Sequence, residues 1–519
     1  MEKIIIDPIT RIEGHLKVEV TVDKGEVKDA RLAGTLFRGW EIILKGRDAR
    51  DASQITQRVC GVCPAVHANA SVFALDDAFG VKESIPDNAR IIRNLILGAN
   101  FLQSHILHFY HLSSLDFFDV AEIFDYEGKE PDLISLKKFL GRGKLSPFTP
   151  RYEGDYRLDK KTNQEFAAHY IKALEIRRKC HEMLAIFGGK MPHSVGIVAG
   201  GVTEKPCPDK IASFLWRLNE IRDFINNFYL PDTLTLVRFY EDNLYTGSSN
   251  SSFLSYGAFN LDSGEFDPTK RNRLFAQGVV SQNCTYETLD VEAISEYIRY
   301  SWYSQNNSNL HPARGITEPD EKKEKAYSWL KAPRYRGEPC EVGPAARMIV
   351  SYFGGKKSIK EALEKTLSQI GGKPVLLSST LGRHIARALD AKLVADNMAE
   401  WILQLKIDEP VYTPCSPPEK GEGMGLTDGP RGALGHWIRI KDKLIDNYQM
   451  VVPTTWNASP RDDKDEPGPV ERALLGLKVK DTANPFEVVR CVRSFDPCLA
   501  CAVHLITPRG KKLNSFRVS

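Results

Sequence analysis

The chain has 519 residues, of which 42% are hydrophobic and 26% charged, a composition typical of a large globular protein with room for several subdomains. Its 70 basic and 67 acidic residues leave a formal net charge of +3, so the strongly basic surface of a nucleic-acid-binding protein is not expected. The mean hydropathy is -0.31 and no apolar run reaches about 18 residues, which argues against a membrane-spanning helix.

The N-terminal segment alternates apolar and polar residues. Residues 17–23 and 26–32 carry this alternation on either side of Lys24-Gly25, which predicts a β-hairpin. The first residues, Met-Glu-Lys-Ile-Ile-Ile-Asp-Pro, lead directly into it and lack the basic region, apolar core and cleavage site of a secretory signal. We therefore expect residues 1–58 to form a β-rich N-terminal part, with helical spacing over residues 40–58.

Long stretches follow in which apolar residues recur at the i, i+3, i+4 spacing of an amphipathic helix. Helices are predicted over residues 88–119, 163–187, 209–228, 358–370 and 380–406. Clusters of glycine, proline and polar residues interrupt them around residues 188–201, over 246–282 and over 414–426. The predicted fold class is therefore α+β and mainly helical. We expect one large domain over residues 1–504, in which residues 59–504 form a mostly helical body.

Two cysteine pairs near opposite ends of the chain are its most informative feature. Cys60 and Cys63 lie in Arg-Val-Cys-Gly-Val-Cys-Pro-Ala-Val-His, and Cys498 and Cys501 lie in Asp-Pro-Cys-Leu-Ala-Cys-Ala-Val-His. A C-x-x-C spacing can aim both sulfurs at one metal, and thiolates favour nickel, zinc, copper(I) or iron–sulfur iron. The other six cysteines are scattered singly, which indicates buried small hydrophobes rather than a disulfide scaffold.

A structural zinc site is the common meaning of two such pairs, and it is the alternative here. Structural zinc usually closes a short excursion of the chain rather than joining its two ends. Each pair is also followed by a histidine beyond what tetrahedral coordination needs, and Arg58 and Asp496 place charged groups beside the sulfurs. The pattern therefore favours a reactive metal centre.

Together with other segments, the two pairs resemble the large, catalytic subunit of nickel–iron hydrogenases, most closely the respiratory uptake type. The resemblance covers essentially the whole chain in the expected order. Its further segments are residues 7–15 (Asp-Pro-Ile-Thr-Arg-Ile-Glu-Gly-His), 37–41 (Phe-Arg-Gly-Trp-Glu), 200–203, 341–347, 430–437 and 452–457. It implies a fold with the active site buried between the chain ends. It also implies an oxidoreductase that reversibly cleaves dihydrogen, heterolytically, into protons and electrons.

The resemblance implies a nickel ion bound by all four cysteines of the two pairs. Cys63 and Cys501 would bridge the nickel to an iron that carries carbon monoxide and cyanide. The negative charges of four thiolates and two cyanides exceed the positive charge of two divalent metals. The remaining negative charge is costly to bury unless cations and hydrogen-bond donors surround the centre. Arg431 matches the family's arginine that caps the cyanides, and Thr454 matches a hydroxyl that donates to one of them. His67 is expected to donate to a cysteine sulfur.

Cys60 and Cys498 would be terminal ligands of the nickel. Heterolytic cleavage needs a base within hydrogen-bond reach, and Cys498 is expected to take the proton. Glu13 matches the family's first proton acceptor beyond that sulfur. Without the resemblance, Glu13 would be interpreted as a surface carboxylate of the hairpin.

The resemblance implies a second metal site as well. Glu41 and His504 match side-chain ligands of a buried divalent ion, usually magnesium, and the backbone carbonyl of Met450 matches a third ligand. Waters would complete the octahedron that magnesium prefers. Histidine is an unusual ligand for so hard an ion.

One position departs from the family pattern. Ser104 stands where many members carry an acidic residue facing the arginine that caps the cyanides. Asp496 is then the expected acidic partner of Arg431. Three histidines, His105, His108 and His111, fall nearby at i, i+3 and i+6, and we expect them to pack in the core or at an interface rather than to bind a metal.

The last fifteen residues, 505–519, carry four basic residues and no acidic residue. On composition alone, this segment is interpreted as a frayed C-terminal tail. The resemblance implies instead an extension that a nickel-dependent endopeptidase removes by cutting after His504, alongside factors that insert nickel and iron. A basic tail attached to a buried ligand would be hard to bury, so cutting would let the C-terminus fold in.

The chain carries no motif for an iron–sulfur cluster, a flavin or a nicotinamide, so electrons must leave through a partner. The resemblance implies a small subunit with iron–sulfur clusters, in a heterodimer or a dimer of heterodimers, and further a membrane cytochrome or quinone-reducing subunit. It implies placement on the periplasmic side of the cell membrane, by export with the small subunit. The alternatives are a cytoplasmic hydrogenase coupled to a soluble carrier, a non-catalytic relative in a respiratory complex, and a zinc-stapled scaffold.

Overall fold

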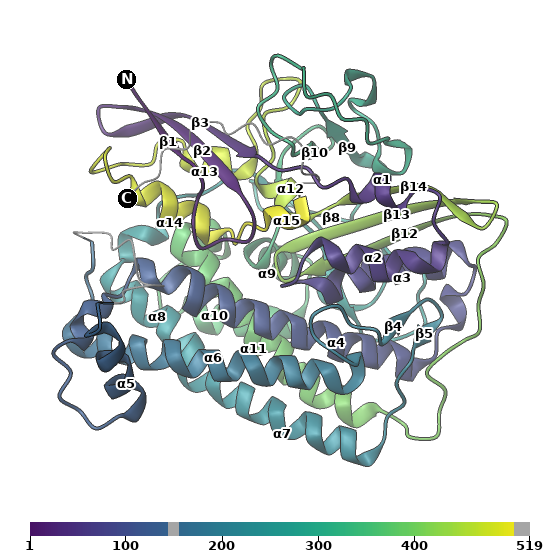
Figure 1. The fold of residues 1–519 in the computed structure, drawn as a ribbon, viewed down its shortest axis with the longest axis horizontal. Helices are drawn as coiled ribbons and strands as arrows, with labels where there is room; N and C mark the ends of the chain where they lie inside the picture. The colour runs from purple at the N-terminus through teal and green to yellow at the C-terminus, as the bar shows by residue number, and fades with distance from the viewer. Residues whose placement is uncertain (144–154, 503–519) are drawn as a thin grey trace.

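The computed structural model describes the backbone of residues 1–143 and 155–502, with the side chains of these residues up to Ala500 (Figure 1). The helices are α1 (Trp40–Leu44), α2 (Ala52–Thr56), α3 (Pro64–Ala78), α4 (Asp87–Ile106), α5 (Pro131–Leu140), α6 (Lys160–Gly188), α7 (Pro208–Phe224), α8 (Leu230–Phe239), α9 (Pro344–Phe353), α10 (Lys357–Leu367), α11 (Thr380–Trp401), α12 (Pro453–Asn457), α13 (Pro469–Leu474), α14 (Phe486–Ser494) and α15 (Leu499–Ala502). The strands are β1 (Glu2–Ile6), β2 (Leu16–Asp23), β3 (Glu26–Gly34), β4 (Ile197–Val198), β5 (Gly201–Val202), β6 (Ser252–Asn260), β7 (Arg273–Val280), β8 (Tyr286–Glu287), β9 (Ile294–Tyr297), β10 (Ala332–Tyr335), β11 (Cys340–Glu341), β12 (Lys420–Gly429), β13 (Gly432–Lys441) and β14 (Leu444–Val451).

The predicted N-terminal hairpin is confirmed as β2 and β3, which pair antiparallel. Lys24 and Gly25 turn the chain with positive φ angles, the conformation that two-residue hairpin loops favour. β1 pairs with the other edge of β2, so the sheet has the order β1-β2-β3. Every second residue of β2 is buried, and this face covers part of the core.

The predicted long helices are confirmed, with shifted ends. The stretch 88–119 is α4 followed by a π-helical segment, Leu107–Ser113, and the stretch 40–58 is broken into α1, α2 and short 3₁₀ turns. The helices α4, α6 and α7 run side by side across the lower half of Figure 1, and α11 packs on α4 and α7. In the part of the chain that the structure describes, no helix is both long and apolar enough to cross a bilayer.

Two further sheets lie where the sequence predicts interruptions of a helical body. β6 and β7 fall within residues 246–282 and form a four-stranded sheet of order β11-β6-β7-β8. β12 begins within residues 414–426 and continues into a three-stranded antiparallel sheet of order β12-β13-β14. Glycine normally weakens a strand prediction, and β12 has glycine at alternate positions because a helix lies against it.

That helix is α3, which packs across β12 (Figure 1). A Cβ atom on Gly423 would lie 2.0 Å from the carbonyl oxygen of Ala74, and one on Gly425 would lie 1.9 Å from that of Ala70. Glycine in the strand and alanine in the helix therefore let the two backbones approach closely. This contact fixes the position of α3, whose first residue follows Cys63.

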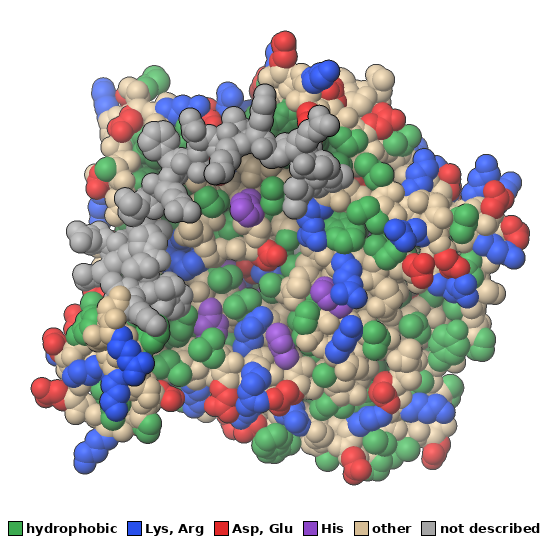
Figure 2. Space-filling view, viewed as in Figure 1, with side chains coloured by type: hydrophobic (Ala, Val, Ile, Leu, Met, Phe, Trp, Pro, Cys, Tyr) green, Lys and Arg blue, Asp and Glu red, His purple; other side chains and the backbone are tan. Residues whose placement is uncertain are grey.

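The two ends of the chain meet above this sheet, where the yellow α15 lies close to the purple N-terminal sheet in Figure 1. Glu13 forms a parallel β-bridge with Cys498. Gly14 has φ +85°, and a Cβ there would lie 2.7 Å from the backbone nitrogen of Ala500, so only glycine fits this approach. Figure 2 shows acidic and basic side chains interspersed around the rim of the same face, in keeping with the small net charge.

Candidate metal centre

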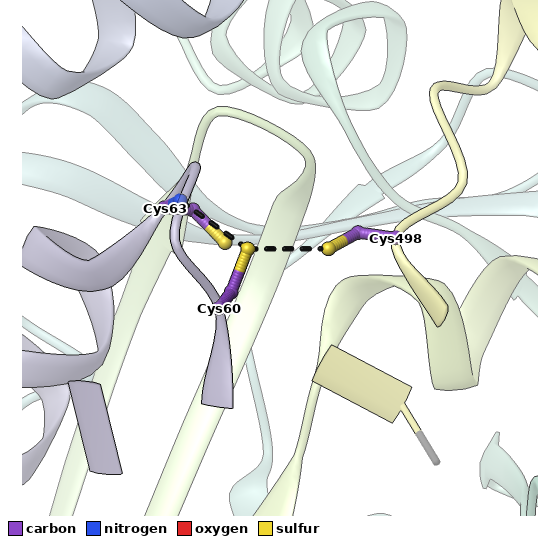
Figure 3. A group of neighbouring side chains, drawn as sticks. All are labelled: Cys60, Cys63 and Cys498. Carbon is purple, nitrogen blue, oxygen red and sulfur yellow. Dashed lines mark hydrogen bonds between the residues drawn. The ribbon is translucent and has the colours of Figure 1, made fainter. Parts of the chain in front are cut away.

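Three cysteines from the two ends of the chain lie together (Figure 3). The sulfurs of Cys60 and Cys498 are 3.4 Å apart, and those of Cys60, Cys63 and Cys498 all lie within 4.8 Å of one another. All three side chains are buried. Cys501 is the third residue of α15, and its side chain lies outside the described residues. Three soft ligand atoms at this spacing are suited to hold a thiophilic metal ion.

The loop between Cys60 and Cys63 is shaped to carry negative charge on sulfur. The backbone N–H groups of Val62 and Cys63 donate to Cys60 Sγ at 3.2 and 3.4 Å. Cys63 is the N-cap of α3, and Pro64 occupies the first helical position, where it fits without losing a hydrogen bond. Amide donors and the positive end of a helix both stabilise a thiolate.

Arg38 joins the two cysteine segments, a role that the sequence did not reveal. Its Nη1 donates to the carbonyl oxygen of Val59 at 2.7 Å and to that of Ala500 at 3.1 Å, and its Nη2 donates to that of Arg58 at 3.0 Å. One guanidinium thus holds the residues just before Cys60 and just after Cys498. The only sequence signal was its place within the segment Phe-Arg-Gly-Trp-Glu.

Arg431 lies beside the sulfurs with its predicted acidic partner. Its Nη2 donates to Asp496 Oδ1 and its Nε to the Asp496 carbonyl oxygen, both at 3.0 Å, and its Nη1 lies 3.4 Å from Ser104 Oγ. Arg431 and Asp496 are both buried. Burial lowers the pKa of Arg431, but Asp496 and the nearby thiolate charges raise it well above its ordinary value. The side chain is therefore a permanent cation beside the three cysteines.

Thr454 holds the backbone of the second cysteine segment. Its Oγ1 accepts the N–H of Cys498 at 2.9 Å. The residue is buried in α12, which begins at Pro453. Accepting this bond does not use the hydroxyl's own proton, so Thr454 can still donate to an acceptor at the centre.

Glu13 lies next to Cys498 along the backbone. The N–H of Leu499 donates to the Glu13 carbonyl oxygen at 2.7 Å, and the N–H of Glu13 donates to the Pro497 carbonyl oxygen at 3.4 Å. The Oε2 atom of Glu13 is buried and has no hydrogen-bond partner among the described residues. Burial raises the pKa of Glu13, and the charge of Cys60 raises it further. A carboxyl with a raised pKa holds its proton up to a higher pH than an ordinary glutamate does.

His67 lies one turn after Cys63 in α3 and is buried. Its Nδ1 is 3.2 Å from Nε2 of His436. Burial lowers the pKa of His67 to about 4, and the charge of Cys60 opposes that shift. The ring is therefore neutral at physiological pH and carries one N–H.

The structure describes two of the three residues predicted to bind the second metal, Glu41 and Met450. Glu41 is buried in α1, its Oε1 accepts the N–H of Met450 at 2.9 Å, and its Oε2 accepts the hydroxyl of Thr317. Glu41 and the Met450 backbone therefore lie side by side. Close to this pair, Lys331 Nζ donates to Gln449 Oε1 at 3.2 Å. His504, the third predicted ligand, lies outside the described residues.

The three histidines near the end of α4 contact different partners. His105 Nε2 is 3.1 Å from Asp390, His108 Nε2 is 2.7 Å from the Arg493 carbonyl oxygen, and His111 Nε2 is 3.2 Å from the Tyr170 carbonyl oxygen. Their ring nitrogens do not converge on one point in the described part of the chain. These contacts agree with the expectation that the three histidines pack in the core or at an interface rather than bind a metal; His105 and His108 are buried and His111 is half-buried.

Comparisons with known proteins agree along the length of the chain. A family model described as Nickel-dependent hydrogenase matches residues 38–504, and one described as HoxL-like matches residues 3–35. The chain is 44% identical to the large subunit of a periplasmic NiFeSe hydrogenase from Desulfomicrobium baculatum, over 97% of this chain and 95% of that one. It is 37% identical to an uptake hydrogenase large subunit from Rhizobium leguminosarum bv. viciae, over 100% of this chain and 97% of that one.

The fold agrees as well. The reduced Ni-Fe-Se hydrogenase of D. vulgaris Hildenborough matches with a TM-score of 0.85 and 44% identity, over 97% of this chain and 100% of that chain. Similarity at this level covers the helical body and the interspersed sheets together. The chain therefore belongs to the nickel-dependent hydrogenase family, as the large, catalytic subunit of an oxidoreductase that acts on dihydrogen.

Proposed function

We propose that the four cysteines of the two pairs hold a nickel–iron centre at which this subunit reversibly cleaves dihydrogen. The observation that carries the proposal is the meeting of three buried sulfurs, from opposite ends of the chain, within 4.8 Å of one another. Thiolates fit nickel, and amide donors with a buried guanidinium fit the negative charge that such a set of ligands brings. When bound, the centre supplies heterolytic cleavage of dihydrogen and takes up its electrons.

Within this proposal, Cys60, Cys63, Cys498 and Cys501 would hold the nickel, and Cys63 and Cys501 would also hold an iron that carries carbon monoxide and cyanide. Such diatomic ligands need donors, because they are anionic or strongly polar in a buried place. Arg431 supports this role, since its charge lies beside the sulfurs and its fork can donate to more than one acceptor. Its contact with Asp496 holds that fork in place.

The proton path begins at Cys498 and continues to Glu13. The backbone pairing of these two residues and the buried, unpartnered Oε2 of Glu13 among the described atoms support the assignment. A carboxyl with a raised pKa can both accept a proton from a thiol and release it again. Thr454 holds the backbone of Cys498 while this exchange takes place.

The second metal is proposed to be magnesium, bound by Glu41, the Met450 carbonyl and His504. The buried Glu41 carboxylate beside Met450 supports it, because carboxylate and carbonyl oxygens are the ligands that magnesium prefers. Glu41→Gln should lower the magnesium content of the purified enzyme, as measured by elemental analysis. Unchanged magnesium would contradict this assignment.

Electrons are proposed to leave through a small subunit with iron–sulfur clusters. The related proteins named above are themselves large subunits. Gly61, between Cys60 and Cys63, is exposed although both cysteines are buried. An exposed residue directly between two buried candidate ligands supports a partner docked on this loop. A membrane cytochrome or quinone-reducing subunit would accept the electrons next.

Maturation and placement complete the proposal. We propose that insertion factors load nickel and iron, and that an endopeptidase then removes residues 505–519 by cutting after His504, leaving residues 1–504 as the mature domain. Finding active enzyme that still ends in Ser519 by intact-mass measurement would contradict the cleavage. The relative named as periplasmic supports placement on the periplasmic side of the membrane.

The decisive experiment is an infrared spectrum of the native complex in the region of metal-bound carbon monoxide and cyanide, with nickel and iron contents measured on the same sample. Sharp bands together with nickel and iron are expected. Zinc in place of nickel, with no bands, would replace the proposal by a structural cysteine site.

A further inference from the structure

A closed set of four buried polar side chains ties α3 to the neighbouring sheet. His67 and Ser71 lie one turn apart on α3, His436 lies in β13 and Tyr448 in β14. His67 Nδ1 is 3.2 Å from His436 Nε2, His436 Nδ1 is 2.8 Å from the Tyr448 hydroxyl, and that hydroxyl donates to Ser71 Oγ at 3.1 Å. All four side chains are at most 1% exposed.

The two rings of this set are neutral. Burial lowers the pKa of His67 to about 4 and that of His436 well below its ordinary value, and His67 lowers the pKa of His436 further. A neutral imidazole carries its proton on one nitrogen only, so one nitrogen donates and the other accepts. The protonated nitrogen of one ring therefore decides that of the other.

The Tyr448 hydroxyl controls the sense of the chain, because it has one proton and two partners. While it donates to Ser71, its oxygen accepts from His436 Nδ1–H, and His436 Nε2 accepts from His67 Nδ1–H. If it turns to His436, every link reverses and His67 carries its proton on Nε2. With Nδ1 engaged by His436, Nε2 is the nitrogen of His67 left for the cysteines, whose charge acts on this ring.

We propose that Tyr448 and His436 are positioning residues that set whether His67 offers the metal centre a donor or an acceptor. The inference rests on the proposed function, since it assigns the cysteines to a metal centre. It extends the assignment of His67 by naming the residues that decide its hydrogen-bonding state. The partner of a metal-site histidine commonly fixes its tautomer, and hydrogen bonds in a chain also polarise one another.

A purely structural role is the competing explanation, in which the four side chains only hold α3 on the sheet. Tyr448→Phe removes the hydroxyl that controls the chain but keeps the ring in the core. Tyr229→Phe is the matched control, because Tyr229 is fully buried and its hydroxyl donates to the His105 carbonyl oxygen at 3.1 Å. Tyr448→Phe loses the hydrogen bonds to His436 and Ser71, and Tyr229→Phe loses the one to His105, so both variants should lower the melting temperature.

The measurement is the infrared spectrum of the native complex in the region of the metal-bound diatomic ligands. Tyr448→Phe should shift or split the bands beyond their line width, and His436→Gln should do the same, whereas Tyr229→Phe should leave them in place. Infrared bands at the wild-type positions in both Tyr448→Phe and His436→Gln, with the metal centre loaded, would overturn this inference and leave the proposed function standing. Absence of bands from the wild type would overturn the proposed function instead.

Discussion

Replacing Glu13 by glutamine tests the proton path directly. The amide has nearly the same size as the carboxyl but cannot accept and release a proton at physiological pH. The contacts that hold Glu13 beside Cys498 come from its backbone, which the substitution leaves unchanged. Its Oε2 has no hydrogen-bond partner among the described residues, so the substitution breaks no bond to that atom. We therefore expect a folded, fully loaded enzyme.

The expected loss of turnover follows from the role of a positioned acid–base group, which contributes about 10²- to 10⁴-fold. At 1.36 kcal/mol for each tenfold change, this corresponds to about 3–5 kcal/mol of activation free energy. The pH dependence has a definite sign. Burial raises the pKa of Glu13, so the wild type should lose its proton acceptor as the pH falls through that raised value. The glutamine variant should lack this limb of the profile.

The assay is hydrogen oxidation with an artificial electron acceptor, on enzyme whose infrared bands match those of the wild type. Glu19→Gln is the control, since Glu19 lies in the same N-terminal sheet and pairs with Lys3 and Lys17 at the surface. It should retain full activity. A Glu13→Gln enzyme with intact bands and activity within about threefold of the wild type would refute the proton path, because the expected minimum loss is about a hundredfold.

Three further outcomes can be checked. Burial raises the pKa of Glu471 from its ordinary value of 4.5 to about 7, so the ionised form destabilises the fold. The free energy of unfolding should therefore drop by about 3 kcal/mol as the pH rises from roughly 4.5 through 7. Glu471→Gln should remove this dependence in thermal melts at several pH values. Gly425→Ala places a methyl group 1.9 Å from the Ala70 carbonyl oxygen and should destabilise the protein by about 1–3 kcal/mol or more. Gly264→Ala, whose methyl group would meet only Asp262 Oδ1 at an ordinary contact distance of 3.9 Å, should change the melting temperature little. Equal effects would contradict the packing of α3 on β12. Arg431→Lys keeps the positive charge but loses the planar guanidinium that reaches both acceptors of Asp496. An unsatisfied buried acceptor costs about 1–3 kcal/mol of stability, and the infrared bands should shift. A spectrum identical to that of the wild type would rule out a place for Arg431 at the centre.

The N-terminal hairpin and the long helices could be predicted from the sequence, because their patterns are local. Alternation on either side of Lys24-Gly25 specifies two strands and the turn between them. Helical spacing over tens of residues likewise specifies α6 and α11, apart from their ends. The sheet β12–β14 was missed for a physical reason. Its contact with α3 requires glycine at alternate positions of β12, and glycine in a sequence alone indicates a break.

The cysteine pairs show the same division at the metal centre. Their spacing predicted the candidate ligand residues, because ligand chemistry is a property of the side chains themselves. Which groups surround the sulfurs depends on contacts between distant segments. Arg38 clamps both cysteine segments, and no local pattern encodes this contact. The resemblance, rather than any local pattern, placed Ser104 opposite Arg431, and the two side chains are 3.4 Å apart.

The amino-acid sequence by itself therefore determined the family, the cysteines proposed for the centre and the local elements that carry them. Only the tertiary structure decided that Glu13 pairs with Cys498 and that His67 is joined to Tyr448 through His436. The physical reason is that hydrogen bonds and burial depend on how α3, β13, β14 and the two chain ends pack together. Packing is a property of the whole fold, whereas ligand spacing and periodicity are properties of short segments.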